Sequence, residues 1–393
     1  MTVLKTQRLW LCHLCHFILP ATLLALTNCA APVNYDVEVE IPSVGEVALN
    51  SSDETPEDWK LLDIGVLIFG TEQQASVRNQ IGENVFAEVR DNERHLLPFS
   101  LRNTLVDSNQ WGAVRVLPQA DPSVDLLIDG RILQSDGTQL QLAVTATDSS
   151  GRQWLNKTYT DRTLATDFPE STDFRNRNRR NLSAVSEPFT DLYEQIANDL
   201  LLARNELSEN QVRQISQISQ MLYAADLSEE SFGDNIQRTA DGQVTIVSLP
   251  PVNDPMMRRV HEMRERHYLF IDTVDEYYEA LYGDMRDSYL LWRRYSFDQI
   301  LEERAAEQRA VTQERYSSSS GYLTLTQRYD RYRWSKIYEL EYRELASGFN
   351  REAAPAILEL NQQVHGLSGT MEEQYLQWRR VLRQLFALEN DAR

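Results

Sequence analysis

Histidine and glutamate residues in one stretch of the chain are spaced almost as in a zinc protease. His261, Glu262 and His267 lie in a segment with helical periodicity. A zinc-binding pair of histidines is four residues apart, which puts both rings on one face of the helix. Here the histidines are six residues apart, about 240° around a helix, so they cannot hold one metal ion. Since His95 and His365 are isolated in the sequence, we predict neither a metal site nor another cofactor.

Motifs of nucleophilic and nucleotide chemistry are absent from the sequence. It has no Ser-x-x-Lys, no Gly-x-Ser-x-Gly, no P-loop and no Gly-x-Gly-x-x-Gly, which are usual signatures of serine hydrolases, nucleotide hydrolases and dinucleotide enzymes. A carboxylate pair for glycoside hydrolysis cannot be picked out by pattern among 59 acidic residues. We therefore predict no catalytic residues and no enzyme. An enzyme that acts on an envelope polymer remains the alternative.

The first 28 residues have the form of an export signal. Lys5 and Arg8 make a basic start, an apolar region follows, and the segment leads into Leu26, Thr27, Asn28 and Cys29. These four residues resemble the lipobox of bacterial lipoproteins, although a smaller residue than Asn28 is usual before the cysteine. The resemblance implies that Cys29 is acylated, with palmitate among its chains, and becomes the mature N-terminus. The alternatives are an uncleaved N-terminal anchor and cleavage by ordinary signal peptidase.

The cysteines of the chain agree with this interpretation. Cys12 and Cys15, with His16, match the pattern for covalent haem attachment, but they lie inside the apolar part of the removable segment. Only Cys29 would remain in the mature chain, and several acyl chains on it would make a stable membrane anchor. In the lipoproteins that this segment resembles, an Asp after the cysteine favours the inner membrane. Ala30 therefore implies the periplasmic face of the outer membrane.

The mature chain is expected to be strongly acidic. The formal net charge is −20, and removing the charges of Lys5 and Arg8 with the signal makes the side-chain total −22. Phosphates repel such a chain, so we predict no nucleic-acid partner. Residues 29–59 are rich in acids, prolines and serines and hold no basic residue. This composition predicts an acidic flexible tether.

Residues 60–205 are predicted to form a small α/β domain with a mixed sheet. Apolar runs at 62–69 and 113–117 suit buried strands, and a helix is expected to start at Pro98 between them. Alternating residues and Asp-Gly or Ser-Gly turns predict three consecutive antiparallel strands, at 124–134, 138–148 and 152–160. A further helix is expected to start near Pro188.

The expected order of elements is strand, helix, strand, three-strand meander and helix. Its motifs are residues 66–69 (Val-Leu-Ile-Phe), 111–116 (Trp-Gly-Ala-Val-Arg-Val) and 124–130 (Val-Asp-Leu-Leu-Ile-Asp-Gly). They resemble the small domain shared by the curli-secretion lipoprotein, the amino-terminal domain of TolB and the lipoprotein activator of penicillin-binding proteins. Val124 departs from that pattern, which has a small residue there. The resemblance implies a binding or assembly module without catalytic residues.

Residues 206–393 are predicted to form an α-helical domain. Capping boxes that begin at Ser208 and Thr370 mark the starts of two helices. Helical periodicity also covers residues 256–316 and 323–347. A short helix is expected after Pro355, and the glycines and prolines of residues 231–254 predict a hairpin or a domain boundary.

Aromatic residues gather in this C-terminal part. Of the 17 tyrosines, 13 lie from residue 268 onward. A helical core, a glycan platform and a protein interface all use such residues. Residues 328–334 hold more large side chains than one helix face can bury. Tyr329, Tyr332 and Trp334 are therefore the predicted contact surface.

Together these patterns predict an α+β protein: a small α/β domain, sandwich-like with a mixed sheet, then an α-helical domain, on an N-terminal lipid-anchored tether. The expected function is that of a non-catalytic outer-membrane lipoprotein that assists the assembly of a cell-envelope complex. Its expected partners are the bilayer, through Cys29, and an unidentified envelope protein. The alternative is a lipoprotein that binds or hydrolyses peptidoglycan or another glycan.

Overall fold

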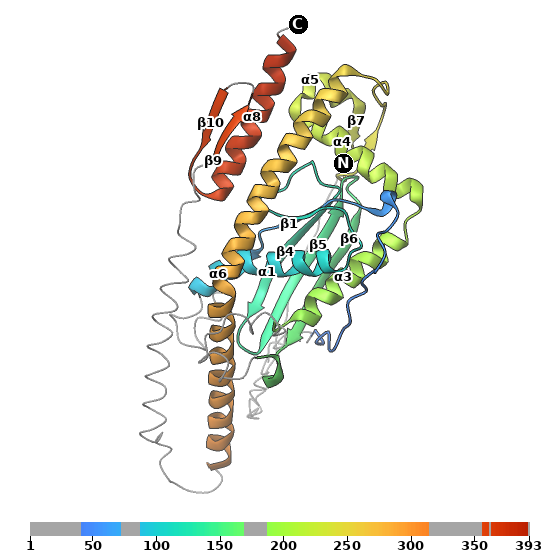
Figure 1. Ribbon diagram of the computed structural model, residues 1–393. Coiled ribbons are helices and arrows are strands. Elements are labelled where there is room, and N and C mark those ends of the chain that lie inside the picture. Colours follow the sequence, from blue (N-terminus) through green and yellow to red (C-terminus); the bar gives the residue numbers. More distant parts are fainter. Residues whose placement is uncertain (1–40, 72–86, 169–186, 314–355, 361–362, 392–393) are drawn as a thin grey trace, which may run out of the picture. The chain divides into compact units, whose positions relative to one another are not determined.

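A mixed sheet of six strands organises the fold (Figure 1). The computed structural model describes residues 41–71, 87–168, 187–313, 356–360 and 363–391. The strands are β1 (Ile64–Leu67), β2 (Gly70–Thr71), β3 (Val114–Leu117), β4 (Leu126–Ser135), β5 (Gln139–Asp148) and β6 (Gln153–Arg162). Their order is β3-β1-β4-β5-β6, with β2 beside β4. β1 is parallel to β3 and β4, whereas β4, β5 and β6 are antiparallel. The α+β class and the three-strand meander are confirmed.

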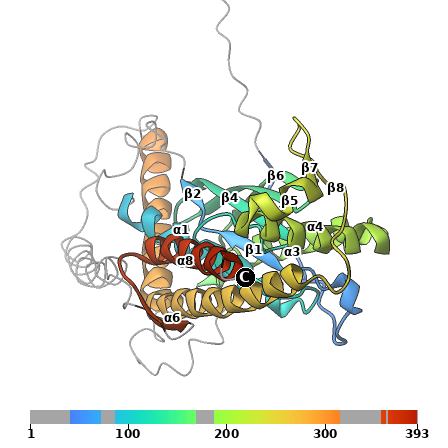
Figure 2. The same ribbon diagram turned by 90° about the horizontal axis from the view of Figure 1, so that it is seen from above.

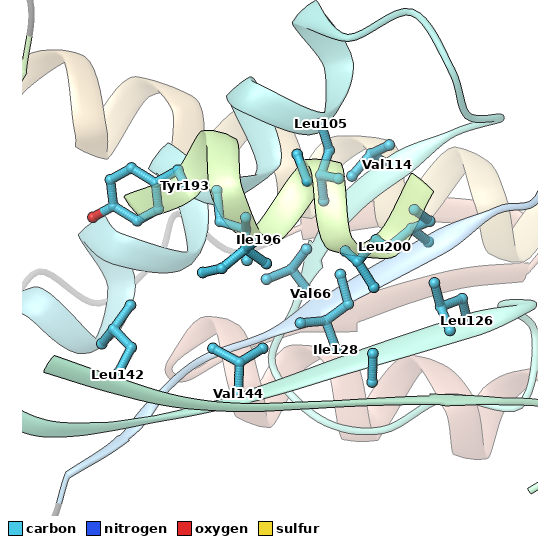
Figure 3. Packing of buried hydrophobic residues seen from close by; sticks show 14 of the residues in the cluster. Val66, Leu105, Val114, Leu126, Ile128, Leu142, Val144, Tyr193, Ile196 and Leu200 are labelled. Carbon is cyan, nitrogen blue, oxygen red and sulfur yellow. The ribbon is translucent and has the colours of Figure 1, made fainter. Parts of the chain in front are cut away.

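Two helices, α1 (Ala87–Asp107) and α3 (Thr190–Asn205), pack on the sheet. β5 alternates, so that Leu140, Leu142, Val144 and Ala146 are buried. Figure 3 shows Tyr193, Ile196 and Leu200 of α3 close to the buried residues of β1, β4 and β5. This is the first apolar cluster of the described fold.

The start of α1 differs from the prediction, because Pro98 lies inside the helix and not at its first turn. Proline has no N–H, so it leaves the carbonyl four residues earlier without its helical partner. Here the N–H of Phe69, just after β1, donates to the carbonyl of Arg94 at 3.0 Å. The Arg94 side chain donates back to the carbonyl of Phe69 at 3.1 Å. The sheet thus satisfies the group that the proline frees, and the helix continues through it.

The second apolar cluster joins the later helices to the β3 edge of the sheet. These helices are α4 (Glu209–Leu227), α6 (Pro255–Gln313) and α8 (Met371–Asp391), with the short α5 (Glu229–Phe232) beside them. Figure 2 shows α8 alongside α6, in agreement with the contacts of Phe270 with Tyr375 and Trp378. Val116 of β3 and Val124, which lies two residues before β4, belong to the same cluster. Residues expected in two domains therefore share one core.

The two capping boxes and the hairpin predicted in the helical part are confirmed. Ser208 caps α4, and Thr370 and Glu373 bond reciprocally at the start of α8. β7 (Ile236–Arg238) and β8 (Val244–Ile246) form the hairpin. The helix expected after Pro355 is wrong: β9 (Ala356–Leu360) pairs with β10 (Gln363–Leu367). A five-residue segment with four apolar residues suits either structure, and antiparallel pairing with the next segment selects the strand.

Residues 41–58, which the composition placed in a flexible tether, run along β6 and α3. The N–H of Val44 donates to the carbonyl of Thr160 at 2.9 Å. Farther along, the N–H of Asn50 donates to the side chain of Asn198 at 2.9 Å. Short polar bonds of this kind fix an extended segment on the fold without a large apolar face.

Gly137, in the turn between β4 and β5, allows a close approach of α6 to the sheet. A Cβ placed there would lie 2.1 Å from the backbone nitrogen of Phe297. We expect Gly137→Ala to lower the free energy of unfolding by about 1–3 kcal/mol, because backbone must move. Gly283→Ala is the control, since no atom lies within 4 Å of its Cβ; in mid-helix it should stabilise by about 0.5–1 kcal/mol. Urea denaturation measures both, and equal effects would contradict the prediction.

Candidate functional site

A buried carboxylate, Asp121, ties the loop after β3 to α6 and α8. Its Oδ2 accepts a hydrogen bond from the hydroxyl of Tyr375 at 2.7 Å and lies 3.1 Å from Nε2 of His267. Nε of Arg379 is 3.5 Å from the same oxygen. The N–H of Ser123 donates to Oδ1 at 2.8 Å. These five residues, the Asp121 cluster, join one loop of the sheet to two helices.

The charge of Asp121 is stabilised by these neighbours. Burial by itself raises the pKa of the Asp121 carboxyl. The electrostatic interactions with His267 and Arg379, together with the hydrogen bonds from His267 and Ser123, outweigh this effect and hold the pKa well below its usual range. Removal of the carboxylate would leave its buried donors facing one another. Asp121 is therefore an electrostatic cross-link between its loop and the two helices.

His267 and Asp121 have the chemistry of a general-base pair, but the ring is enclosed. His267 is fully buried, and its ring stacks on Tyr223 with centroids 5.7 Å apart. Tyr375 lies 5.8 Å away, centroid to centroid. A general base must reach the proton that it removes, directly or through one water. In this enclosure the histidine serves packing, whereas His261 on the same helix is exposed, so the two rings lie on different faces.

A second buried junction, the Arg293 cluster, lies farther along α6 and comprises Arg293, Glu93, Ser135 and Tyr289. Nη2 of Arg293 lies 2.7 Å from Oε1 of Glu93, and both side chains are fully buried. The hydroxyls of Ser135 and Tyr289 donate to the same carboxylate oxygen at 2.8 and 3.0 Å. Arg293 also donates to the carbonyl of Asp136 in the β4–β5 turn. Helices α1 and α6 and one end of the meander therefore meet at one ion pair.

The β3 edge of the sheet is closed by a side chain of α6. Oδ1 of Asp275 accepts a hydrogen bond from the N–H of Val116 at 3.0 Å. Its Oδ2 lies 2.5 Å from Nη2 of Arg102 on α1. An edge strand with free N–H groups can pair with another chain. At Val116, Asp275 accepts the hydrogen bond that a strand of another chain would otherwise accept.

A third junction joins α1, α6 and α8 at Glu372. Oε1 of Glu372 lies 3.4 Å from Nε2 of His95, and the hydroxyl of Tyr278 donates to the same oxygen at 3.3 Å. The hydrogen bond from His95 is the largest cause that lowers the pKa of Glu372, to about 2 from 4.5. The folded state thus favours the charged carboxylate.

We expect Glu372→Gln to flatten the acid limb of the stability curve. The pKa of Glu372 is lower in the folded than in the unfolded chain, so the unfolded chain takes up its proton first as the pH falls. The stabilisation is complete above 4.5 and is lost as the pH falls toward about 2. Urea midpoints at pH 5 and pH 3 should differ less in the variant than in the parent. An unchanged difference would contradict the assignment.

An exposed apolar segment follows the β7–β8 hairpin. We call residues 247–252 the proline loop, because Pro250 and Pro251 lie at its centre. Val247, Leu249 and Val252 are exposed. The loop leads into α6 through Asp254, whose carboxylate accepts the N–H of Met256 at 2.7 Å.

The residues predicted as functional from the sequence are not among those that the structure describes. Cys29, the proposed acylation site, and the first part of the tether precede residue 41. Tyr329, Tyr332 and Trp334 fall within residues 314–355, also outside the described part. Aromatic residues of the described helices are mostly core, among them Tyr278, Trp292, Tyr375 and Trp378.

Sequence reasoning did not single out Asp121, Glu93 or Arg293. The chain is 25% charged, so the residue type of these three side chains gives no signal by itself. Arg293 does follow Trp292 within the apolar face of α6. An arginine at a buried helix position indicates a partner acid. This position was the signal in the sequence that could have identified Arg293.

Comparisons with known proteins do not show a family for this chain. No family model matches it, and no curated protein matches it. Among solved structures, the chain resembles a crystal structure of a protein from Xanthomonas campestris described by the family model DUF330. The two are 14% identical, the match covers 42% of this chain and 94% of the other, and the TM-score is 0.22. A score this low supports no argument about fold or function. Within the described residues, no helix combines the length and apolar character needed to cross a membrane.

Proposed function

We propose that this chain is a lipid-anchored outer-membrane protein that faces the periplasm and assists a cell-envelope assembly through protein contacts, without catalysis. The observation that carries the proposal is that two pairs of acidic and basic side chains are buried at structural contacts. Asp121 with His267, and Glu93 with Arg293, are buried and bind one another across the junction of sheet and helices. Side chains held in this way make a rigid scaffold.

The order of elements also supports the proposal. Strand, helix, strand, meander and helix follow one another in β1, α1, β3, β4 to β6 and α3. This is the order implied by the resemblance to the small domain of the curli-secretion lipoprotein, TolB and the penicillin-binding-protein activator. In that group the domain is a binding or assembly module, and we extend this role to the present chain.

Lipidation is the part of the proposal that can be tested first. We expect the parent chain to incorporate a palmitate analogue and to fractionate with the outer membrane, because Leu26, Thr27, Asn28 and Cys29 resemble a lipobox. Cys29→Ser should lose the label and remain unprocessed or be released, since acylation supplies the anchor. Cys15→Ser is the control and should keep both properties. Equal labelling of the parent and Cys29→Ser would sink the proposal.

A further inference from the structure

The proline loop lies in a stretch of unusual composition. From Gly242 to Asn253 no residue is charged, in a chain that is 25% charged. Val247 is 61% exposed, Leu249 is 56% exposed and Val252 is completely exposed. Single exposed apolar residues are common on protein surfaces, whereas several together mark a contact site.

The loop is held at both ends by hydrogen bonds. The N–H of Val247 donates to the carbonyl of Asn235 at 2.8 Å, and the side chain of Asn235 donates to the carbonyl of Ser248 at 3.0 Å. At the other end, the N–H of Asp254 donates to the carbonyl of Pro251 at 2.9 Å. A loop that is fixed before binding loses less conformational entropy when it binds. The exposed side chains are therefore presented in an ordered state.

The hairpin that carries the loop is itself fixed to the sheet. The N–H of Val244 donates to the carbonyl of Ser150 in the β5–β6 turn at 2.8 Å. Gly151 in that turn has φ +83°, and a Cβ there would lie 2.4 Å from the carbonyl oxygen of Gly242. This close approach requires glycine. Figure 1 shows the hairpin and α5 at the same end of the fold.

The two prolines indicate which kind of binding surface the loop fits. Proline fixes φ near −65° and has no N–H to donate, so Leu-Pro-Pro-Val favours an extended polyproline II conformation. Partners recognise such segments in grooves lined by aromatic rings, which accept the proline rings and the flanking apolar side chains. Neither α-helix nor β-strand covers residues 247–251, and the segment ends in a turn at Val252 and Asn253 that the hydrogen bond from Asp254 to Pro251 closes.

Charge distinguishes a protein groove from a bilayer. Acidic residues outnumber basic ones in the segments around the loop: Glu229, Glu230, Asp234, Asp241 and Asp254, against Arg238, Arg258 and Arg259. A membrane-inserting segment would instead combine aromatic side chains with flanking lysine or arginine. The loop contains neither. The rim fits a groove bordered by basic residues.

We propose that the proline loop docks in an aromatic-lined groove, bordered by basic residues, on another envelope protein. This inference rests on the proposed function, since it names the kind of partner that the adaptor binds. Leu249 and Val252 are the side chains that enter the groove, and Pro250 and Pro251 set the conformation that the groove selects.

The test is photo-cross-linking in living cells with the full chain. A benzophenone amino acid replaces Leu249 or Val252, and the matched control carries it at Leu202, which is 62% exposed on α3. We expect a protein adduct of defined mass from the two loop positions and none from the control. Replacing Pro250 and Pro251 by alanine should lower the adduct about tenfold, and a synthetic peptide of residues 243–254, but not its double-alanine form, should compete in membrane extracts.

Several results would overturn the inference. They are an adduct with lipid, an adduct with a second copy of this chain, a yield no higher than at Leu202, and a yield that survives loss of both prolines. Melting curves of the double-alanine variant exclude unfolding as the cause of a loss. Palmitate labelling of Cys29 is scored separately, so a labelled chain without loop adducts refutes the docking site and leaves the proposed adaptor standing.

Discussion

Replacing Arg293 by methionine should lower the free energy of unfolding by about 3–5 kcal/mol. Methionine fills much of the space but leaves the carboxylate of Glu93 buried without its cation, which is the costly way to break a buried ion pair. It also removes the guanidinium from the rings of Phe189, Tyr289 and Trp292, which lie 4.8 to 5.3 Å away. Urea denaturation followed by tryptophan fluorescence measures the loss.

The chain provides a matched control for this experiment. Arg213 lies 2.7 Å from Glu209, the same distance as between Arg293 and Glu93, but both side chains are exposed on α4. Arg213→Met should change the stability by less than about 1 kcal/mol, because water solvates the acid that remains. Joint replacement of Glu93 and Arg293 by apolar residues should recover part of the loss. A loss at Arg213 as large as at Arg293 would show that burial does not control the effect.

Asp121→Asn should cost about 3 kcal/mol at neutral pH. The carboxylate accepts hydrogen bonds from Tyr375 and Ser123 and lies beside the guanidinium of Arg379, and an amide of the same shape turns an N–H₂ toward these donors. Hydrogen bonds to a charged group contribute about 1.5–3 kcal/mol each when buried partners cannot find water. Asp129→Asn is the control, because Asp129 is exposed on β4.

The same substitution should change the response to acid. The pKa of Asp121 lies below 3.8 in the folded chain and near that value when the chain unfolds. As the pH falls below about 4, the unfolded chain takes up the proton first, and the free energy of unfolding decreases. The variant lacks this contribution, so the gap between parent and variant should narrow between pH 5 and pH 3. A gap that widens over this interval would contradict the ion-pair role.

Local patterns in the sequence determined the meander and several helix starts. Leu140, Leu142, Val144 and Ala146 alternate because successive side chains of a strand point to opposite faces. Ser208, before α4, acts through Gln211, three positions along the chain. Since these signals involve neighbours in the chain, spacing and residue type are enough to recognise them.

Tertiary structure alone decided where the charged residues went and which helix could contain a proline. Pro98 stands inside α1 because the N–H of Phe69, in the link between β1 and β2, donates to the carbonyl that the proline frees. The partner that makes Arg293 a buried residue is Glu93, 200 positions away. Burying a charge costs free energy, and a partner of opposite charge offsets that cost. Which partner is near depends on what folding brings together, and no local spacing encodes that. For the same reason the role of Asp121 could not be predicted from the sequence, because its hydrogen bond to Tyr375 spans 254 positions.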